Sequence, residues 1–172
     1  MKRILAVVVL GCVMVAGGTS YAEGLAVDVV PTVNREEAWV YVSGEVNRRF
    51  YVVVSNVSDR PQRVYEDWNS WGYFSLSFEV RTAQGKVVKI TRSERDWSKN
   101  FASTYTIPAG GHYVLPVQWS TNEWQNLNLI SGAEQQPVRL KAVFEIPEAE
   151  TNTYRVWTGR VESVPREVRV NK

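Results

Sequence analysis

Two aromatic and polar stretches of the chain carry the side chains best suited to bind a ligand. The first runs from Tyr65 to Phe74, and the second runs from Arg92 to Phe101. Flat aromatic rings stack on sugar rings or fill pockets of a protein partner, and neighbouring polar groups add directional hydrogen bonds. The candidate binding residues are Trp68, Asn69, Trp71, Tyr73, Asp96 and Trp97.

The tryptophans of these stretches also have a purely structural interpretation. A loop without a disulfide needs large anchors to hold its shape, and Trp68, Trp71 and Trp97 could cap one end of a β-sandwich. Both interpretations stay open at this point.

Little in the sequence points to catalysis. The single histidine, His112, lies between a Gly110-Gly111 turn and an alternating apolar segment, so we expect it to face solvent at the start of a strand. There is no Gly-x-Ser-x-Gly elbow for a nucleophilic serine. Scattered carboxylates give only an unspecific signal for glycoside hydrolysis; they are Glu66, Asp67, Glu94 and Asp96. We predict that the protein is not an enzyme.

Metal and cofactor sites have no signature either. A closed zinc site needs about four Cys, His or carboxylate ligands, and the chain has one His and one Cys. The acidic residues occur in short pairs rather than at the spacing of a calcium loop. No phosphate-binding or dinucleotide fingerprint is present, so we expect neither a metal nor a cofactor.

The first residues have the pattern of a secretory signal peptide. Lys2 and Arg3 precede an apolar run from Ile4 to Ala16, and small residues flank a cleavage position after Ala22. The run is too short to cross a bilayer, which takes about 20 apolar residues. We expect residues 1–22 to be removed, leaving a mature periplasmic or extracellular chain without a transmembrane segment.

A lipoprotein signal is the alternative. Val9-Leu10-Gly11-Cys12 resembles the box in which the cysteine is lipidated and becomes the new N-terminus. That interpretation leaves a very short apolar core before Cys12. It also leaves Val13 to Ala16 as an unexplained apolar segment after the cysteine, so we favour cleavage after Ala22.

Removing the signal changes the charge and the cysteine content. The chain has 20 basic and 18 acidic residues, and the two basic residues Lys2 and Arg3 lie in the signal. The mature chain is therefore neutral and cysteine-free, and its charges are interspersed. Such a surface argues against a nucleic-acid partner. Without disulfides the domain depends on its core, to which seven Trp contribute.

Apolar residues recur at every second position along most of the mature chain, which is typical of β-strands. The clearest alternating segments are 50–55, 74–80, 113–119 and 138–146. Weaker strands are expected at 25–30, 39–42, 63–65, 87–90, 154–161 and 167–170.

The pattern predicts an all-β fold: one immunoglobulin-like antiparallel β-sandwich over residues 23–172, with seven to nine strands. Residues 23–38 are expected as an edge strand or a lead-in. Only Thr121 to Leu129 looks helical, with Asn122 as its cap and with Trp124 and Leu127 pointing inward.

Two segments resemble bacterial immunoglobulin-like domains. Phe50 to Pro61 reads FYVVVSNVSDRP, and Ile107 to Trp119 reads IPAGGHYVLPVQW. Both resemble, in this order, features of the intracellular proteinase inhibitor family of bacilli. Trp68 to Phe78 also resembles exported planctomycete-type domains of unknown role. The resemblance implies a β-sandwich and, less directly, a proteinase-binding role.

These observations favour a non-catalytic exported binding or structural module. The expected partner is a protein of the cell envelope, held through an aromatic loop surface. The alternatives are a carbohydrate-binding module with a polysaccharide ligand, which predicts coplanar exposed indoles, and a proteinase inhibitor, which predicts one rigid protruding loop.

Overall fold

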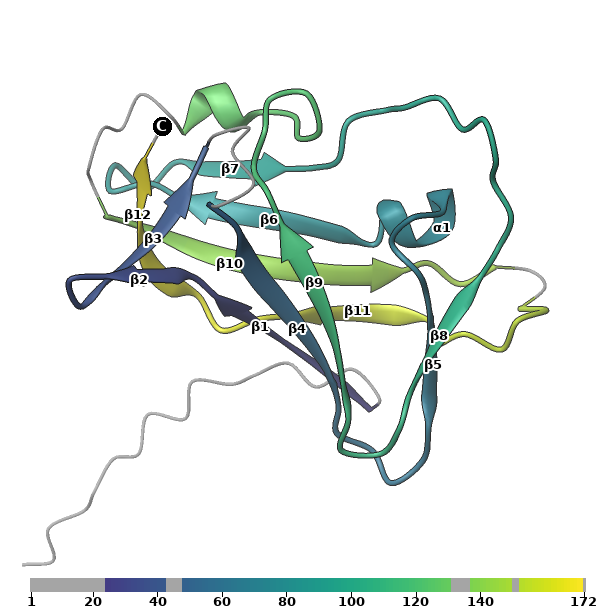
Figure 1. Ribbon diagram of the computed structural model, residues 1–172. Helices are drawn as coiled ribbons and strands as arrows, with labels where there is room; N and C mark the ends of the chain where they lie inside the picture. The colour runs from purple at the N-terminus through teal and green to yellow at the C-terminus, as the bar shows by residue number, and fades with distance from the viewer. Residues whose placement is uncertain (1–23, 43–47, 131–136, 150–151, 172) are drawn as a thin grey trace, which may run out of the picture.

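The chain folds into two β-sheets packed face to face, with a two-stranded ribbon at one side (Figure 1). The computed structural model describes residues 24–42, 48–130, 137–149 and 152–171. The predicted signal peptide and Cys12 lie outside the described residues. Strands dominate the described part, which confirms the all-β fold class, and their number there is twelve rather than the predicted seven to nine.

The smaller sheet has three antiparallel strands in the order β1-β4-β9. These are β1 (Leu25–Val30), β4 (Phe50–Asn56) and β9 (His112–Val117). β1 is therefore an ordered edge strand, and its alternate residues Leu25, Val27 and Val29 are buried. The segments that carry the family resemblance contribute β4 and β9, which lie side by side.

The larger sheet has the order β2-β3-β12-β10-β6-β7, and β11 also pairs with β10. Its strands are β2 (Thr32–Asn34), β3 (Glu37–Tyr41), β6 (Leu76–Arg81), β7 (Val87–Ile90), β10 (Pro137–Ile146), β11 (Gly159–Glu162) and β12 (Arg166–Asn171). β12 and β3 run parallel, whereas the other pairs are antiparallel.

One buried serine joins the two halves of β10. β12 pairs with the first half of this strand and β11 with the second half. Between them, the backbone N–H of Ala142 donates to Ser163 Oγ over 2.9 Å, and the backbone N–H of Ser163 donates to the carbonyl of Ala142 over 2.9 Å. The change of partner strand therefore leaves no buried backbone group of Ala142 unsatisfied.

The core lies between the two sheets and is filled by alternate strand residues, as the period of two predicts. At its centre, the rings of Phe50, Phe78 and Trp119 meet edge to face, with centroids 5.2–5.6 Å apart. Trp124 adds a further ring 5.3 Å from Phe78. Large aromatic area of this kind stabilises a small domain without crosslinks.

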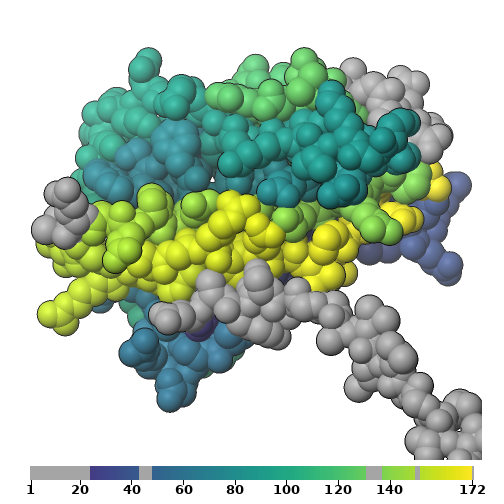
Figure 2. Space-filling view, turned by 180° about the vertical axis from the view of Figure 1, so that it is seen from behind, coloured from purple at the N-terminus to yellow at the C-terminus, as the bar shows by residue number. Residues whose placement is uncertain are grey.

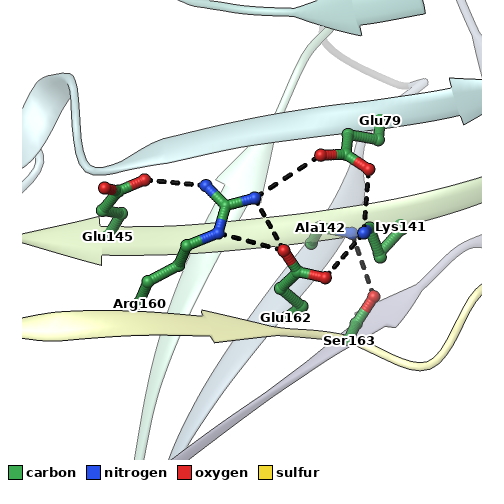
Figure 3. Close-up of polar contacts among 7 residues, drawn as sticks. All are labelled: Glu79, Lys141, Ala142, Glu145, Arg160, Glu162 and Ser163. Carbon is green, nitrogen blue, oxygen red and sulfur yellow. Dashed lines mark hydrogen bonds and ion pairs between the residues drawn. The ribbon is translucent and has the colours of Figure 1, made fainter. Parts of the chain in front are cut away.

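The outer face of the larger sheet is charged. Figure 3 shows Arg160 of β11 between Glu145, Glu162 and Glu79, with nitrogen–oxygen distances of 2.8, 2.6 and 3.4 Å. Lys141 joins the same network through Glu162 (2.6 Å) and Glu79 (2.8 Å). Figure 2 views the molecule from behind, where the C-terminal segment (yellow) runs beside β10. This face is solvated and not part of the core.

The ribbon of β5 (Gln62–Tyr65) and β8 (Thr104–Ile107) extends the molecule to one side. Two turns connect it to the smaller sheet, one after β4 and one before β9. Both views show the corner that contains the first turn projecting from the body (Figures 1 and 2). The sequence did not predict β8 or β2, because neither shows a run of alternating apolar residues.

The helical prediction was wrong in detail. Residues 121–129 form turns and a short 3-10 helix at Leu127–Leu129, preceded by Asn126 rather than capped by Asn122. Trp124 and Leu127 do point inward, as predicted. The α-helix is instead α1 (Ser70–Tyr73), in the tryptophan-containing loop. Among the described residues, no helix has the length and apolar character to cross a membrane.

Candidate functional site

The loop between β5 and β6 is built around the buried side chain of Asn69. Its Oδ1 accepts from the backbone N–H of Gly72 (3.1 Å), which caps α1, and its Nδ2 donates to the carbonyl of Ser103 (3.1 Å). Asn69 is fully buried. The predicted binding residue is therefore a structural N-cap that ties the loop to the segment before β8.

Gly72 allows the loop to fold closely onto itself. A Cβ atom at this position would fall on the carbonyl carbon and oxygen of Glu66. Both are backbone atoms and cannot move aside without displacing the turn. The absence of a side chain at Gly72 thus sets how α1 sits against the end of β5, and so where the neighbouring Trp71 points.

Tyr73, which is buried, and Trp97, which is partly buried, belong to a second cluster of rings. Their rings meet edge to face with centroids 5.4 Å apart, and Tyr73 is 5% exposed. The guanidinium of Arg95 lies 4.4 Å from the Trp97 ring centre, and that of Arg92 lies 4.6 Å from Tyr73 and 4.0 Å from Trp124. This stack of rings and arginines supports the capping interpretation for Trp97.

Arg92 is the largely buried cation of this cluster. Burial lowers the pKa of its guanidinium, while Tyr73 and Glu123 oppose the shift. Its Nη1 pairs with Glu123 Oε2 at 3.2 Å. Asp96, which precedes Trp97 in the chain, is exposed.

Trp68 is exposed, but its ring is held in place. Its centroid lies 4.8 Å from that of Phe101 in an edge-to-face contact, and its Nε1 donates to Glu66 Oε2 (3.2 Å). The same carboxylate oxygen accepts from Ser103 Oγ. These contacts orient the indole across the loop.

An aromatic groove of about 600 Å³ lies on the other side of α1. We use the name aromatic groove for the surface whose rings are Tyr65, Trp71, Phe74, Phe101 and Tyr154. Trp71 is 46% exposed and Tyr154 is 42% exposed, so their faces are open to a ligand. Tyr65 lies between them, with ring centroids 6.1 Å from Trp71 and 6.2 Å from Tyr154.

The wall opposite α1 is the connection between β10 and β11, and its described part is held rigidly. Asn152 closes a tight turn, because its Oδ1 accepts from the backbone N–H of Val156 (2.9 Å) and its Nδ2 donates to the carbonyl of Val156 (2.6 Å). Arg63 Nη1 donates to the carbonyl of Tyr154 (3.0 Å). The backbone N–H of Trp157 donates to the carbonyl of Arg63 (2.7 Å). α1 and this wall lie at the same end of the molecule (Figure 1).

Apart from the Asn152 amide, the polar side-chain groups that line the groove are hydroxyls and carboxylates. Ser70, Thr153 and Thr158 contribute hydroxyls, and Glu145 and Glu148 contribute carboxylates. Burial, together with the nearby Tyr154, raises the pKa of the Tyr65 phenol, so this group stays neutral at physiological pH. The groove can therefore offer ring faces, hydrogen bonds and negative charge.

His112 lies elsewhere. It is the exposed first residue of β9, and its Nδ1 lies 2.8 Å from Ser55 Oγ on the neighbouring strand β4. No carboxylate completes a triad with this pair among the hydrogen bonds of the described residues. In the same part of the chain, no three His, Cys, Asp or Glu side chains gather as they do around a metal ion.

Of the six predicted binding residues, only Trp71 lines the aromatic groove. Tyr65, Phe74 and Phe101 lay within the two stretches that the sequence pointed to, but their roles were not predicted. Tyr154 was expected in a strand, whereas β11 begins only at Gly159. The signal that could have found it is the Asn152 to Arg155 run, whose turn-forming residues interrupt the alternation.

Comparison with known proteins adds no family to this description. No family model matches the chain, and no curated protein matches its sequence.

Proposed function

We propose that the protein is an exported, non-catalytic binding module that holds a segment of a partner protein of the cell envelope in the aromatic groove. One observation carries this proposal: a groove of about 600 Å³ lined by half-exposed Trp and Tyr rings on a hydrogen-bonded scaffold. Ligand sites typically have volumes of about 300–1,000 Å³. Rings that are already oriented lose little entropy when a ligand binds. The export pattern of residues 1–22 supports a location at the envelope.

The chemistry of the groove supports binding rather than catalysis. Its described lining residues include no His or Lys to activate a nucleophile and no Cys to act as one. Ser75 Oγ, one of the two serine hydroxyls there, donates to the carbonyl of Gly72 over 2.6 Å. The proton of this hydroxyl is therefore already used in a hydrogen bond at the end of α1.

The angles between the rings favour a polypeptide over a polysaccharide. A sugar chain binds best to coplanar rings, but Tyr65 is inclined by 31° to Trp71 and by 68° to Tyr154. Trp71 is the only indole among the described residues that line the groove. Side chains of different shape that project from one extended segment match such inclined faces better.

A proteinase-inhibitor-like role is the second candidate, and the projecting corner favours it. Residues 57–61 lie on this corner, and Val57 is 51% exposed. Asn56 braces the turn through hydrogen bonds to Ser58 and Arg60. Rigid loops of this kind bind proteinases tightly. A titration of subtilisin and trypsin with the purified protein tests this role, which requires inhibition that is complete at one equivalent.

Selection of peptides on the protein tests the main proposal. Twelve-residue peptides are selected by phage display on the purified protein, and the affinity of the synthetic peptides is measured by fluorescence titration. We expect Trp71→Ala and Tyr154→Ala each to weaken binding about tenfold or more, because exposed aromatic anchors carry much of the binding energy at such sites. Their thermal unfolding should stay close to that of the wild type.

Tyr51→Ala is the matched control. Tyr51 is 44% exposed, much like Tyr154, but lies on the outer face of the smaller sheet. Its substitution should leave peptide affinity unchanged. Binding that is equally strong in the Trp71 and Tyr154 variants would refute the groove as the site. Binding only of cello- or chito-hexaose, dependent on Trp71, would replace the protein ligand by a polysaccharide.

A further inference from the structure

Arginine side chains cover several aromatic rings of this protein outside the groove. Arg92 lies over Tyr73 and Trp124, Arg95 lies over Trp97, and Arg169 lies 5.9 Å from the centre of the Trp39 ring. An aromatic face is attractive to a cation because its π electrons are negative. In these places the chain supplies the cation itself.

The rings of the aromatic groove differ in this respect. Among the described residues, no Lys or Arg lies over Tyr65, Trp71 or Tyr154. The described residues that line the groove include no basic side chain at all. These faces are therefore available to a cation from outside.

Two carboxylates, those of Glu145 and Glu148, line the groove. Glu145 pairs with Arg160 at 2.8 Å, and this arginine belongs to the charged outer face of the larger sheet. Glu148 lines the groove from the wall opposite α1 and forms no ion pair with another described residue. Glu148 is thus the carboxylate whose charge is left for a ligand.

We propose that the groove selects a cationic side chain, so that the bound segment carries an Arg or Lys that stacks on an aromatic ring of the groove and pairs with Glu148. This inference rests on the proposed function and specifies its ligand. A guanidinium is the better fit, because its flat, weakly hydrated group stacks on aromatic faces while its N–H groups reach a carboxylate.

A neutral copy of the ligand tests the charge separately from the groove. The probe is the tightest selected peptide whose binding depends on Trp71. It is compared with a copy in which citrulline replaces each Arg and N-acetyl-lysine replaces each Lys. We expect the neutral copy to bind about tenfold more weakly at low salt, since it loses both the cation–π contact and the charge pair.

The variant Glu148→Gln tests whether the carboxylate of Glu148 is the group that pairs with the cationic peptide. We expect this variant to bind the cationic peptide about two- to fivefold more weakly and the neutral copy as tightly as the wild type does. Glu167→Gln, which removes the same charge from exposed β12, should change neither affinity.

The possible results separate the two proposals. Selected peptides without Arg or Lys, or a neutral copy that binds as tightly as its parent, would overturn the charge selection and leave the groove as a binding site. If no selected peptide depends on Trp71, both proposals fail. If spermidine competes with the peptide but its acetylated form does not, the charge selection is supported.

Discussion

The side-chain amide of Asn56 donates a hydrogen bond of 2.9 Å to the carbonyl of Ile107, 51 residues later in the chain. The same Nδ2 also lies within 3.1 Å of the carbonyl oxygens of Arg60 and Pro108, and Oδ1 accepts from the backbone N–H of Ser58. One buried side chain thereby joins the turn after β4 to the turn before β9, and the projecting corner depends on it.

Asn56→Asp should destabilise the protein by about 2–4 kcal/mol. The substitution keeps the shape and the acceptor oxygen but removes the donor, and it places a charge beside buried carbonyl groups. Urea unfolding followed by tryptophan fluorescence measures the change. Ser58→Ala, which loses only partly exposed hydrogen bonds, is expected to cost about 1 kcal/mol or less. Equal losses in the two variants would mean that Asn56 does not brace the corner.

Gly72→Ala should cost about 3 kcal/mol, because the new Cβ collides with the Glu66 backbone and forces the loop apart. The measurement is again the free energy of unfolding, together with peptide affinity, which should fall as Trp71 moves. Gly110→Ala is the control: its φ is +70°, and no atom lies within 4 Å of the added Cβ. Strain alone should then cost about 1 kcal/mol.

Trp97→Ala and Trp68→Ala should differ in their effects. Trp97 loses its contact with Tyr73 and the cation–π contact with Arg95, so we expect a loss of about 1–3 kcal/mol. Trp68 is 41% exposed, so Trp68→Ala should lower the free energy of unfolding by less. Thermal unfolding of the two single variants decides the matter. A larger loss for Trp68→Ala would contradict the capping role given to Trp97.

The charged face of the larger sheet predicts a loss of stability in acid. The hydrogen bond from Lys141, aided by one from Arg160, lowers the pKa of Glu162 below its ordinary value of 4.5. The stabilisation is therefore complete above about pH 4.5 and is lost as the pH falls through the lower pKa of the folded state. Glu162→Gln should be less stable than the wild type by about 1 kcal/mol or less at pH 7.

That difference should shrink as the pH falls below 4.5 and through the lower pKa of Glu162 in the folded state, where the wild type becomes protonated. Urea unfolding at several pH values measures it, and salt at neutral pH should reduce it as well. A difference that stays constant over the whole acid range in which the protein remains folded would show that the carboxylate charge of Glu162 does not stabilise the fold.

The strands of the core could be predicted because their signal is local. Every second residue of 50–55 and 138–146 is apolar, and burial against a facing sheet requires that alternation. β8 gives no such signal, because its exposed residues gain their strand geometry by pairing with β5. Likewise, Asn126 adopts φ 68° and donates to the Lys89 carbonyl, so a tertiary contact replaces the helix that the sequence suggested.

The sequence by itself determined the all-β class and the two stretches rich in aromatic residues. Only the tertiary structure decided which of those rings open to solvent. Asn69 and Tyr73 are buried and Trp97 packs against Tyr73, whereas Trp71 is exposed beside Tyr65, which in turn contacts Tyr154. The physical reason is that alternation along a strand is encoded in neighbouring residues. The exposure of a loop side chain instead depends on which distant segments pack beside it, and Trp71 and Tyr154 lie 83 positions apart.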